Sequence, residues 1–131
     1  MYYPAVDSQC NSGSVNEFAN GYMLSKGNLN YSWKHYLKDG KDGFVATASP
    51  LYASIEELQG IAPALIVTAE ADVLRDEGEA YVGRLTEAGV PVTGVRALGV
   101  IHGFLGIATS GPAVDSILDQ TVGFLNRQWG I

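Results

Sequence analysis

The sequence predicts an α/β fold in which parallel strands alternate with helices. Residues 64–68 form a short apolar run rich in branched side chains, which is typical of a strand covered on both faces of a parallel sheet. The run ends in an acid and continues directly into a helical pattern. Along the chain the predicted order is strand, helical insertion, strand, helix, strand, helix, which implies three parallel strands joined by right-handed crossovers.

Composition limits the class of protein. The 131 residues are 47% hydrophobic and 17% charged, which suits one domain, or part of one, with its own core. The net charge of −6 argues against nucleic-acid binding, which needs a basic face. No apolar run approaches the roughly twenty residues of a membrane span, and residues 1–6 do not resemble a signal peptide. The single cysteine, Cys10, excludes an internal disulfide and fits a reducing compartment, so we expect a soluble, cytoplasmic protein.

The first six residues resemble the second half of a strand that ends at Pro4. Because a domain rarely starts inside a central strand, we expect more of the fold to precede them. The open edge of this strand would then be an apolar pairing surface. It could pair with the missing amino-terminal half of the fold, or with a second copy of the chain in a homo-oligomer.

Residues 12–40 predict a helical insertion after the first strand. Ser14 and Glu17 match a capping box, which would start a short helix that stops near Gly27. A second helix follows, with an amphipathic stripe made of Leu29, Trp33, Tyr36 and Leu37. Aromatic residues on a helix are most often ordinary core packing. The alternative is a lid over an apolar substrate pocket.

The rest of the chain supplies the remaining elements. Ser54 and Glu57 match a second capping box, and the helix after Asp72 runs to about residue 88, with two acids in its first turn that complement the helix dipole. A strand is expected over residues 90–97. The last helix starts at Pro112, and its apolar stripe consists of Val114, Ile117, Leu118, Val122, Leu125 and Trp129.

Asp72 and His102 each follow a predicted strand. Open α/β sheets place their ligands at the carboxyl ends of the strands, where an acid and a histidine distant in sequence can meet. An imidazole can take a proton from a nucleophile and return it to a leaving group, while a buried carboxylate fixes its tautomer. Two plainer interpretations remain open: Asp72 could simply cap the helix that follows it, and His102 could be a solvated loop residue.

Five short motifs occur in order along the chain. They are Tyr3-Pro4 with Asp7, Ser49-Pro50-Leu51, Asp72-Val-Leu-Arg-Asp-Glu-Gly78, Glu79-Ala-Tyr81 and Ile101-His-Gly-Phe104. Together they resemble the hormone-sensitive-lipase-like α/β-hydrolases, also called the α/β-hydrolase fold-3 esterases and lipases. The resemblance implies that Asp72 is the acid and His102 the base of a catalytic triad, with Val73 where proline is usual. It also implies a partial α/β-hydrolase fold: the last three parallel strands, their flanking helices and part of the helical cap at about residues 12–40, all within one domain over residues 1–131.

Two elements of that family are missing from the sequence. One is the G-x-S-x-G turn that presents the nucleophilic serine, and the other is the H-G-G-G-type segment of the oxyanion hole. Ser12, Ser14 and Ser110 lack the required flanking glycines, and Cys10 lies in a loop rather than on such a turn. We therefore expect a truncated serine hydrolase that holds two triad members and is catalytically silent alone.

The resemblance implies a carboxylic ester hydrolase that acts on short- to medium-chain esters and needs no metal or organic cofactor. Its candidate substrate contacts are Phe18, Tyr22, Trp33 and Phe104. One alternative is a non-catalytic ligand-binding or association module on the same fold, as in the plant gibberellin receptors, which resemble this family but have lost the histidine; retention of His102 argues against it. A flavodoxin-like domain is disfavoured because no glycine-rich phosphate loop follows the first strand.

Overall fold

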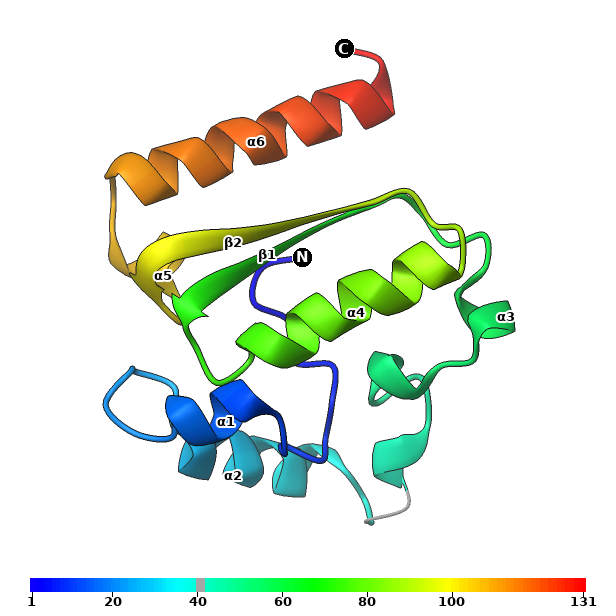
Figure 1. Ribbon diagram of the computed structural model, residues 1–131, viewed down its shortest axis with the longest axis vertical. Coiled ribbons are helices and arrows are strands. Elements are labelled where there is room, and N and C mark those ends of the chain that lie inside the picture. The colour runs from blue at the N-terminus through cyan, green and yellow to red at the C-terminus, as the bar shows by residue number, and fades with distance from the viewer. Residues whose placement is uncertain (40–41) are drawn as a thin grey trace.

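The computed structural model describes residues 1–39 and 42–131, and its centre is a pair of parallel strands between helices (Figure 1). β1 (Ala64–Ala71) and β2 (Val92–Ile101) are joined by the crossover helix α4 (Arg75–Glu87). α4 covers one face of the pair and α6 (Pro112–Trp129) covers the other. The predicted alternation of parallel strands and helices is confirmed.

Side chains of β1 alternate between these two covered faces. Ile66 packs with Tyr81 and Leu85 of α4. The side chains on the other face of β1 pack toward α6; they are Leu65, Val67 and Ala69. Burial on both sides explains why the strand reads as a continuous apolar run instead of an alternating one.

The first expected strand is reduced to a single parallel bridge between Tyr2 and Val67. Around it, the Tyr3 N–H donates to the carbonyl of Val67 at 2.6 Å and the Val67 N–H donates to Met1 at 3.0 Å. The pairing stops there because Tyr3 has a positive φ of 33° and Pro4 has no N–H to donate. The parallel direction agrees with expectation, but within the described residues the sheet has two strands and not three.

The helical insertion differs from expectation at its start. α1 (Gly13–Glu17) is capped by the side chain of Ser12, which accepts the N–H of Val15 at 3.4 Å. Ser14 lies inside the helix, where its hydroxyl donates to the carbonyl of Val73. The expected capping box at Ser14 is therefore wrong, because that hydroxyl is bound to a neighbouring segment.

A second helix begins sooner than expected. α1 ends at Glu17, and turns and bends lead to α2 (Lys26–Tyr36), so Gly27 lies in the first turn of α2 and does not end a helix. Ser25 and Asn28 form the capping box that starts α2. The predicted amphipathic helix is confirmed. The expected end of the whole insertion, at residue 40, lies outside the described residues.

Short helices then lead into the sheet. They are η1 (Asp42–Phe44), η2 (Pro50–Tyr52) and α3 (Ile55–Leu58), the last with the expected capping box between Ser54 and Glu57. β2 extends beyond the predicted residue 97 to Ile101 and is followed by α5 (Phe104–Ile107). The extra length brings His102 to the end of β2.

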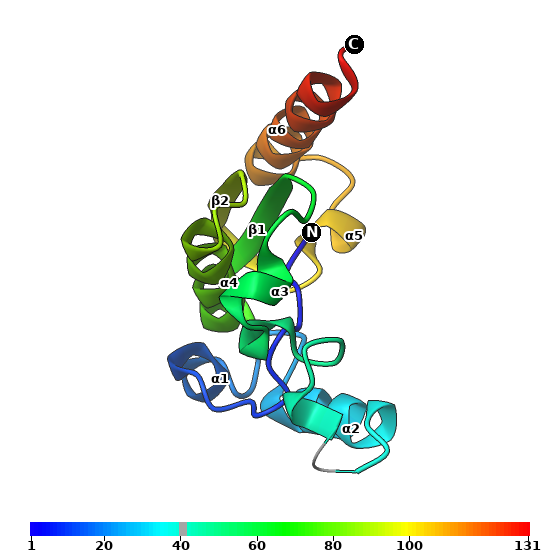
Figure 2. The ribbon, with the colours of Figure 1, turned by 90° about the vertical axis from the view of Figure 1, so that its right-hand side faces the viewer.

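α6 starts at Pro112 as predicted, but its apolar stripe is wider than the surface it covers. Val114 and Ile117 are buried, whereas the side chains farther along the stripe are mostly exposed, with Leu118 at 46%, Val122 at 56% and Trp129 at 68%. Figure 2 shows α6 extending beyond the strands at one end of the molecule, with α1 and α2 at the other. Among the helices that the structure describes, none is long and apolar enough to cross a membrane.

Candidate active site

Asp72 and His102 meet where β1 and β2 end. Ala71 pairs with Ile101 across the sheet, after a register shift that follows Ala69, so the next residue of each strand is brought to the same edge. The Oδ2 atom of Asp72 lies 2.8 Å from Nδ1 of His102. The structure thus brings together the two side chains that sequence analysis singled out.

Both oxygens of Asp72 have partners. Oδ1 accepts the backbone N–H of Leu74 at 2.9 Å, and Oδ2 faces His102. Asp72 is 1% exposed and precedes the N-cap residue Leu74 by two positions, so it supports the turn into α4 as well as the imidazole. The cap-only interpretation of this acid is therefore incomplete.

The pairing fixes the chemistry of the imidazole. A carboxylate can only accept, so in the neutral ring Nδ1 of His102 carries the hydrogen and Nε2 keeps a free lone pair. The His102 side chain is 23% exposed, whereas that of Asp72 is fully buried. This arrangement can hold a base in one tautomer and stabilise the cation that forms when Nε2 takes up a proton.

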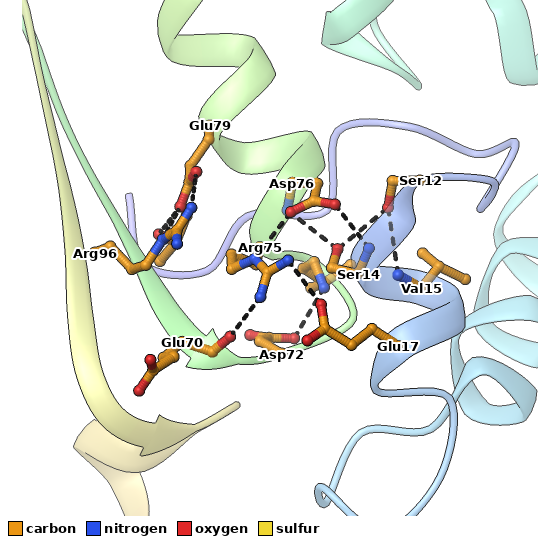
Figure 3. Close-up of polar contacts among 12 residues, drawn as sticks. Ser12, Ser14, Val15, Glu17, Glu70, Asp72, Arg75, Asp76, Glu79 and Arg96 are labelled. Carbon is orange, nitrogen blue, oxygen red and sulfur yellow. Dashed lines mark hydrogen bonds and ion pairs between the residues drawn. The ribbon is translucent and has the colours of Figure 1, made fainter.

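Arg75 ties the loop after β1 to the helical insertion (Figure 3). Its guanidinium donates to the Glu70 carbonyl at 3.2 Å, to Glu17 of α1 at 3.0 Å and to Asp76 at 2.9 Å. It also lies 5.0 Å from the centre of the Phe18 ring, which is a cation–π contact. One side chain therefore joins the carboxyl end of β1 to α1.

A buried serine completes this connection. The Ser14 hydroxyl donates to the Val73 carbonyl at 2.8 Å and accepts the N–H of Asp76 at 3.1 Å, while the Asp76 carboxylate accepts the N–H of Ser14 at 2.7 Å. Figure 3 shows these contacts between α1 and the start of α4. The sequence pattern did not indicate the supporting roles of Ser14, Arg75 and Asp76, although Arg75 and Asp76 lie in the motif that begins at Asp72.

The four aromatic candidates occupy different places. Phe18 and Trp33 are buried in one cluster with Val73 and Leu74, and Phe104 is buried in another cluster beside the strands. Tyr22 is 38% exposed and meets Phe18 edge-on at 5.1 Å. The structure does not gather the four around one cavity, and their contact with substrate stays a prediction.

Tyr3 is a neighbour of the imidazole that sequence analysis did not foresee. Its ring centre lies 4.8 Å from that of His102 and 6.0 Å from that of Phe104. The signal was present in the motif Tyr3-Pro4, but the pattern alone did not show which side chain the tyrosine would touch.

Within residues 1–39 and 42–131 no hydroxyl or thiol is hydrogen-bonded to His102. Cys10 is 5% exposed, and burial together with the nearby charges of Glu77 and Asp7 raises the pKa of its thiol to about 11. A neutral thiol is a weak nucleophile. The same described ranges contain no group of three or more His, Cys, Asp or Glu side chains arranged to hold a metal ion.

Comparisons with known proteins point to one family. A family model described as the alpha/beta hydrolase fold matches residues 1–106. An arylesterase of Saccharolobus solfataricus is 43% identical over 104 residues, which is 79% of this chain and 33% of that protein.

Two solved structures extend the comparison. An esterase from Rhizomucor miehei superposes with a TM-score of 0.91 at 45% identity, over 97% of this chain and 39% of the other. A thermostable esterase from Pseudomonas putida superposes with a TM-score of 0.88 at 43% identity, over 92% of this chain and 38% of the other. The chain thus spans well under half the length of these relatives, and the expected partial α/β-hydrolase fold is confirmed. It belongs to the α/β-hydrolase fold family, among the hormone-sensitive-lipase-like esterases, and spans their carboxyl-terminal portion.

Proposed function

We propose that this chain supplies the acid and the base of a carboxylic ester hydrolase. The observation that carries the proposal is the 2.8 Å contact between Asp72 Oδ2 and His102 Nδ1 at adjacent strand ends. Esterases among the relatives support the reaction class. Retention of the acid–imidazole contact favours catalysis over a purely ligand-binding module.

The proposed chemistry is acyl transfer to a serine followed by hydrolysis. Nε2 of His102 takes the proton of the attacking hydroxyl and delivers it to the leaving alkoxide, while Asp72 stabilises the imidazolium formed in between. Neither step needs a metal or an organic cofactor. Substrates are short- to medium-chain esters.

The nucleophile and the oxyanion donors must come from another segment, because the sequence contains no G-x-S-x-G and no H-G-G-G motif. Removing a single oxyanion donor costs a factor of about 10² to 10³, and removing the serine of a triad costs on the order of 10⁶ in kcat. The isolated chain is therefore proposed to be inactive.

The amino-terminal portion of the fold is the proposed partner. Its docking surface is the open edge beside Met1 and Tyr2, next to a depression of about 430 Å³ between the start of β1, α4 and α6. The lining is mostly apolar and includes Met1, Tyr2, Pro63, Leu65, Phe124 and Leu125. A strand added at this edge would cover it. A second copy of the chain is the competing occupant.

The remaining assignments follow from the same proposal. α1 and α2 form part of a cap over the acyl pocket, at about residues 12–40. Tyr22 is the most exposed of its four aromatic candidates, the others being Phe18, Trp33 and Phe104. The protein is proposed to act in the cytoplasm.

The test is hydrolysis of p-nitrophenyl butyrate by the purified chain, alone and mixed with the amino-terminal portion of the Rhizomucor miehei esterase. We expect no turnover alone and restored turnover in the mixture, which His102→Ala abolishes. A matched control is His35→Ala, on the exposed side of α2. Turnover by the chain alone that His102→Ala removes would place a nucleophile inside these residues. Restored turnover that survives His102→Ala would refute the role of His102.

A further inference from the structure

Residues 1–7 run beside the first half of β1 to the start of α4 and are held at several points. Tyr2 forms the bridge to Val67 at one end. In the middle, Pro4 lies over Gly78 of α4, where an added Cβ would come within 3.6 Å of Pro4 and 2.9 Å of a methyl group of Thr68. The glycine of the motif is thus needed for the close approach between α4 and β1, and Pro4 packs on it at ordinary contact distance.

Glu77 holds the other end of the segment. Its Oε1 accepts the N–H groups of Val6 at 2.7 Å and Asp7 at 3.1 Å. Glu77 is 2% exposed, and its Oε2 is buried with no hydrogen-bond partner among the residues described. An acid in the first turn of a helix normally points to solvent, and burial of a carboxyl group is costly. Its burial here places an acceptor beside two backbone donors.

The strained point of the segment is Tyr3, between these anchors. Its φ of 33° lies in the left-handed region, which a bulky residue occupies only when its surroundings hold it there. Tyr3 is also the residue whose ring lies 4.8 Å from the ring of His102. The anchors on either side therefore determine where the tyrosine ring lies against the imidazole.

We propose that Glu77 is a positioning residue for His102, acting through residues 3–7. Its carboxyl group holds the Val6 and Asp7 amides, which keeps Tyr3 against the imidazole and restricts rotation of that ring about its contact with Asp72. The importance of this positioning for catalysis rests on the role proposed above for His102. The ring position itself is independent of that role.

Glu79 offers a matched control on the same helix. It accepts a half-buried hydrogen bond from Thr68 at 3.1 Å and an exposed one from Arg96, so its removal also costs polar contacts. No hydrogen bond joins Glu79 to residues 1–7 in the described structure. A loss of stability alone would affect variants at 77 and 79 alike, whereas repositioning would appear at 77 only.

The test is NMR of the full chain with its two histidines isotopically labelled. His35, stacked on Tyr31 at 4.0 Å, is the internal reference. Tyr3→Leu is expected to remove a ring-current shift from the His102 ring protons. Glu77→Leu should remove most of the same shift and leave His35 unchanged, and the double variant should add nothing further. Glu77→Gln, which keeps an acceptor oxygen, and Glu79→Leu should both leave His102 as in the original chain.

A second readout follows the anchor directly. Burial raises the pKa of the Glu77 carboxyl to about 7. The chemical shifts of the Val6 and Asp7 amide protons should therefore change with a midpoint near pH 7 in the original chain and not in Glu77→Gln. Unchanged His102 signals in a folded Glu77→Leu variant would overturn the proposal, as would equal shifts in Glu77→Gln and Glu77→Leu. If Glu77→Leu does not fold, Glu77→Asp decides, since it withdraws the oxygen by one carbon–carbon bond. Unchanged His102 signals in that variant would also overturn the proposal.

Failure here is distinguishable from failure of the proposed function. The NMR signals report the place of the His102 ring whether or not the chain takes part in ester hydrolysis. Conversely, restored hydrolysis in the mixture that depends on His102, together with His102 signals that ignore Glu77, would refute the positioning role alone.

Discussion

The loop after β1 and the outer face of α6 differ in how fully their side chains are satisfied by contacts within the chain. In the loop and the first turn of α4, Asp72, Arg75 and Asp76 are each hydrogen-bonded to partners from other segments or from the adjoining turn. On α6, by contrast, Leu118, Val122 and Trp129 leave apolar surface exposed. Changes at the loop should therefore have large effects, and changes on α6 should have small ones.

The largest effect is expected from Asp72→Asn in the mixture that restores hydrolysis. The amide keeps an oxygen that can accept the N–H of Leu74. It has no negative charge, however, so it cannot stabilise the imidazolium of His102 as the carboxylate does. We expect kcat to fall by about 10⁴-fold, as when a triad acid is replaced in this way. The measurement is the steady-state rate with p-nitrophenyl butyrate. A fall of less than about tenfold would contradict the triad role.

A pH-dependent effect comes next. Burial raises the folded-state pKa of Glu77 from 4.5 to about 7, with the charges of Asp7 and Asp72 acting in the same direction and the hydrogen bonds from Val6 and Asp7 opposing it. Between pH 4.5 and 7 the folded chain thus binds more protons at this group than the unfolded chain, so its contribution to stability is largest at low pH and falls as pH rises.

The size of this loss is on the order of 3 kcal/mol. It can be measured as the unfolding free energy in urea at pH 5 and pH 8, with Glu77→Gln as the control in which this component should be absent. Equal pH dependence in the two proteins would show that Glu77 does not titrate in this range.

A smaller effect is expected from Ser14→Ala. The change removes the hydrogen bonds to Val73 and Asp76 and leaves buried backbone groups unpaired, which costs about 1–3 kcal/mol of unfolding free energy. Ser116→Ala on the exposed side of α6 is the matched control. Urea unfolding of both variants gives the comparison, and equal losses would mean that the Ser14 contacts do not hold α1 to the loop.

The smallest effect is expected on α6. Val122→Lys should change the unfolding free energy by less than about 0.5 kcal/mol, because the side chain is 56% exposed. The same substitution at Ile117, which is 3% exposed, should be strongly destabilising. A loss at Val122 comparable to that at Ile117 would show that the outer face of α6 is covered in solution, for example by a second copy, and light scattering would then reveal the assembly.

The parts of the fold that could be predicted depend on local pattern. The β1 run, the capping box at Ser54 and the proline at the start of α6 act within a few residues, so they were predicted correctly. The meeting of Asp72 and His102 was predictable as well, since parallel strands end at the same edge and both residues lie in motifs.

The parts that could not be predicted depend on contacts with segments that are distant in the sequence. Ser14 matched a helix cap by pattern, but the carbonyl of Val73 takes its hydroxyl. Glu77 was expected to complement the dipole at the start of its helix, but its carboxyl group is buried against residues 6 and 7. The apolar stripe of α6 indicates which face is apolar, but not how much of that face is buried by the rest of the chain.

The most direct test is the tautomer of the neutral His102 ring, read from its nitrogen chemical shifts at a pH where the ring carries one hydrogen, with His35 as the reference. Asp72 at 2.8 Å should hold the hydrogen on Nδ1 and leave Nε2 unprotonated. Asp72→Asn should weaken that preference while the fold persists. A ring protonated at Nε2 alone, or nitrogen shifts that ignore Asp72→Asn, would contradict the claim that this chain presents an oriented base.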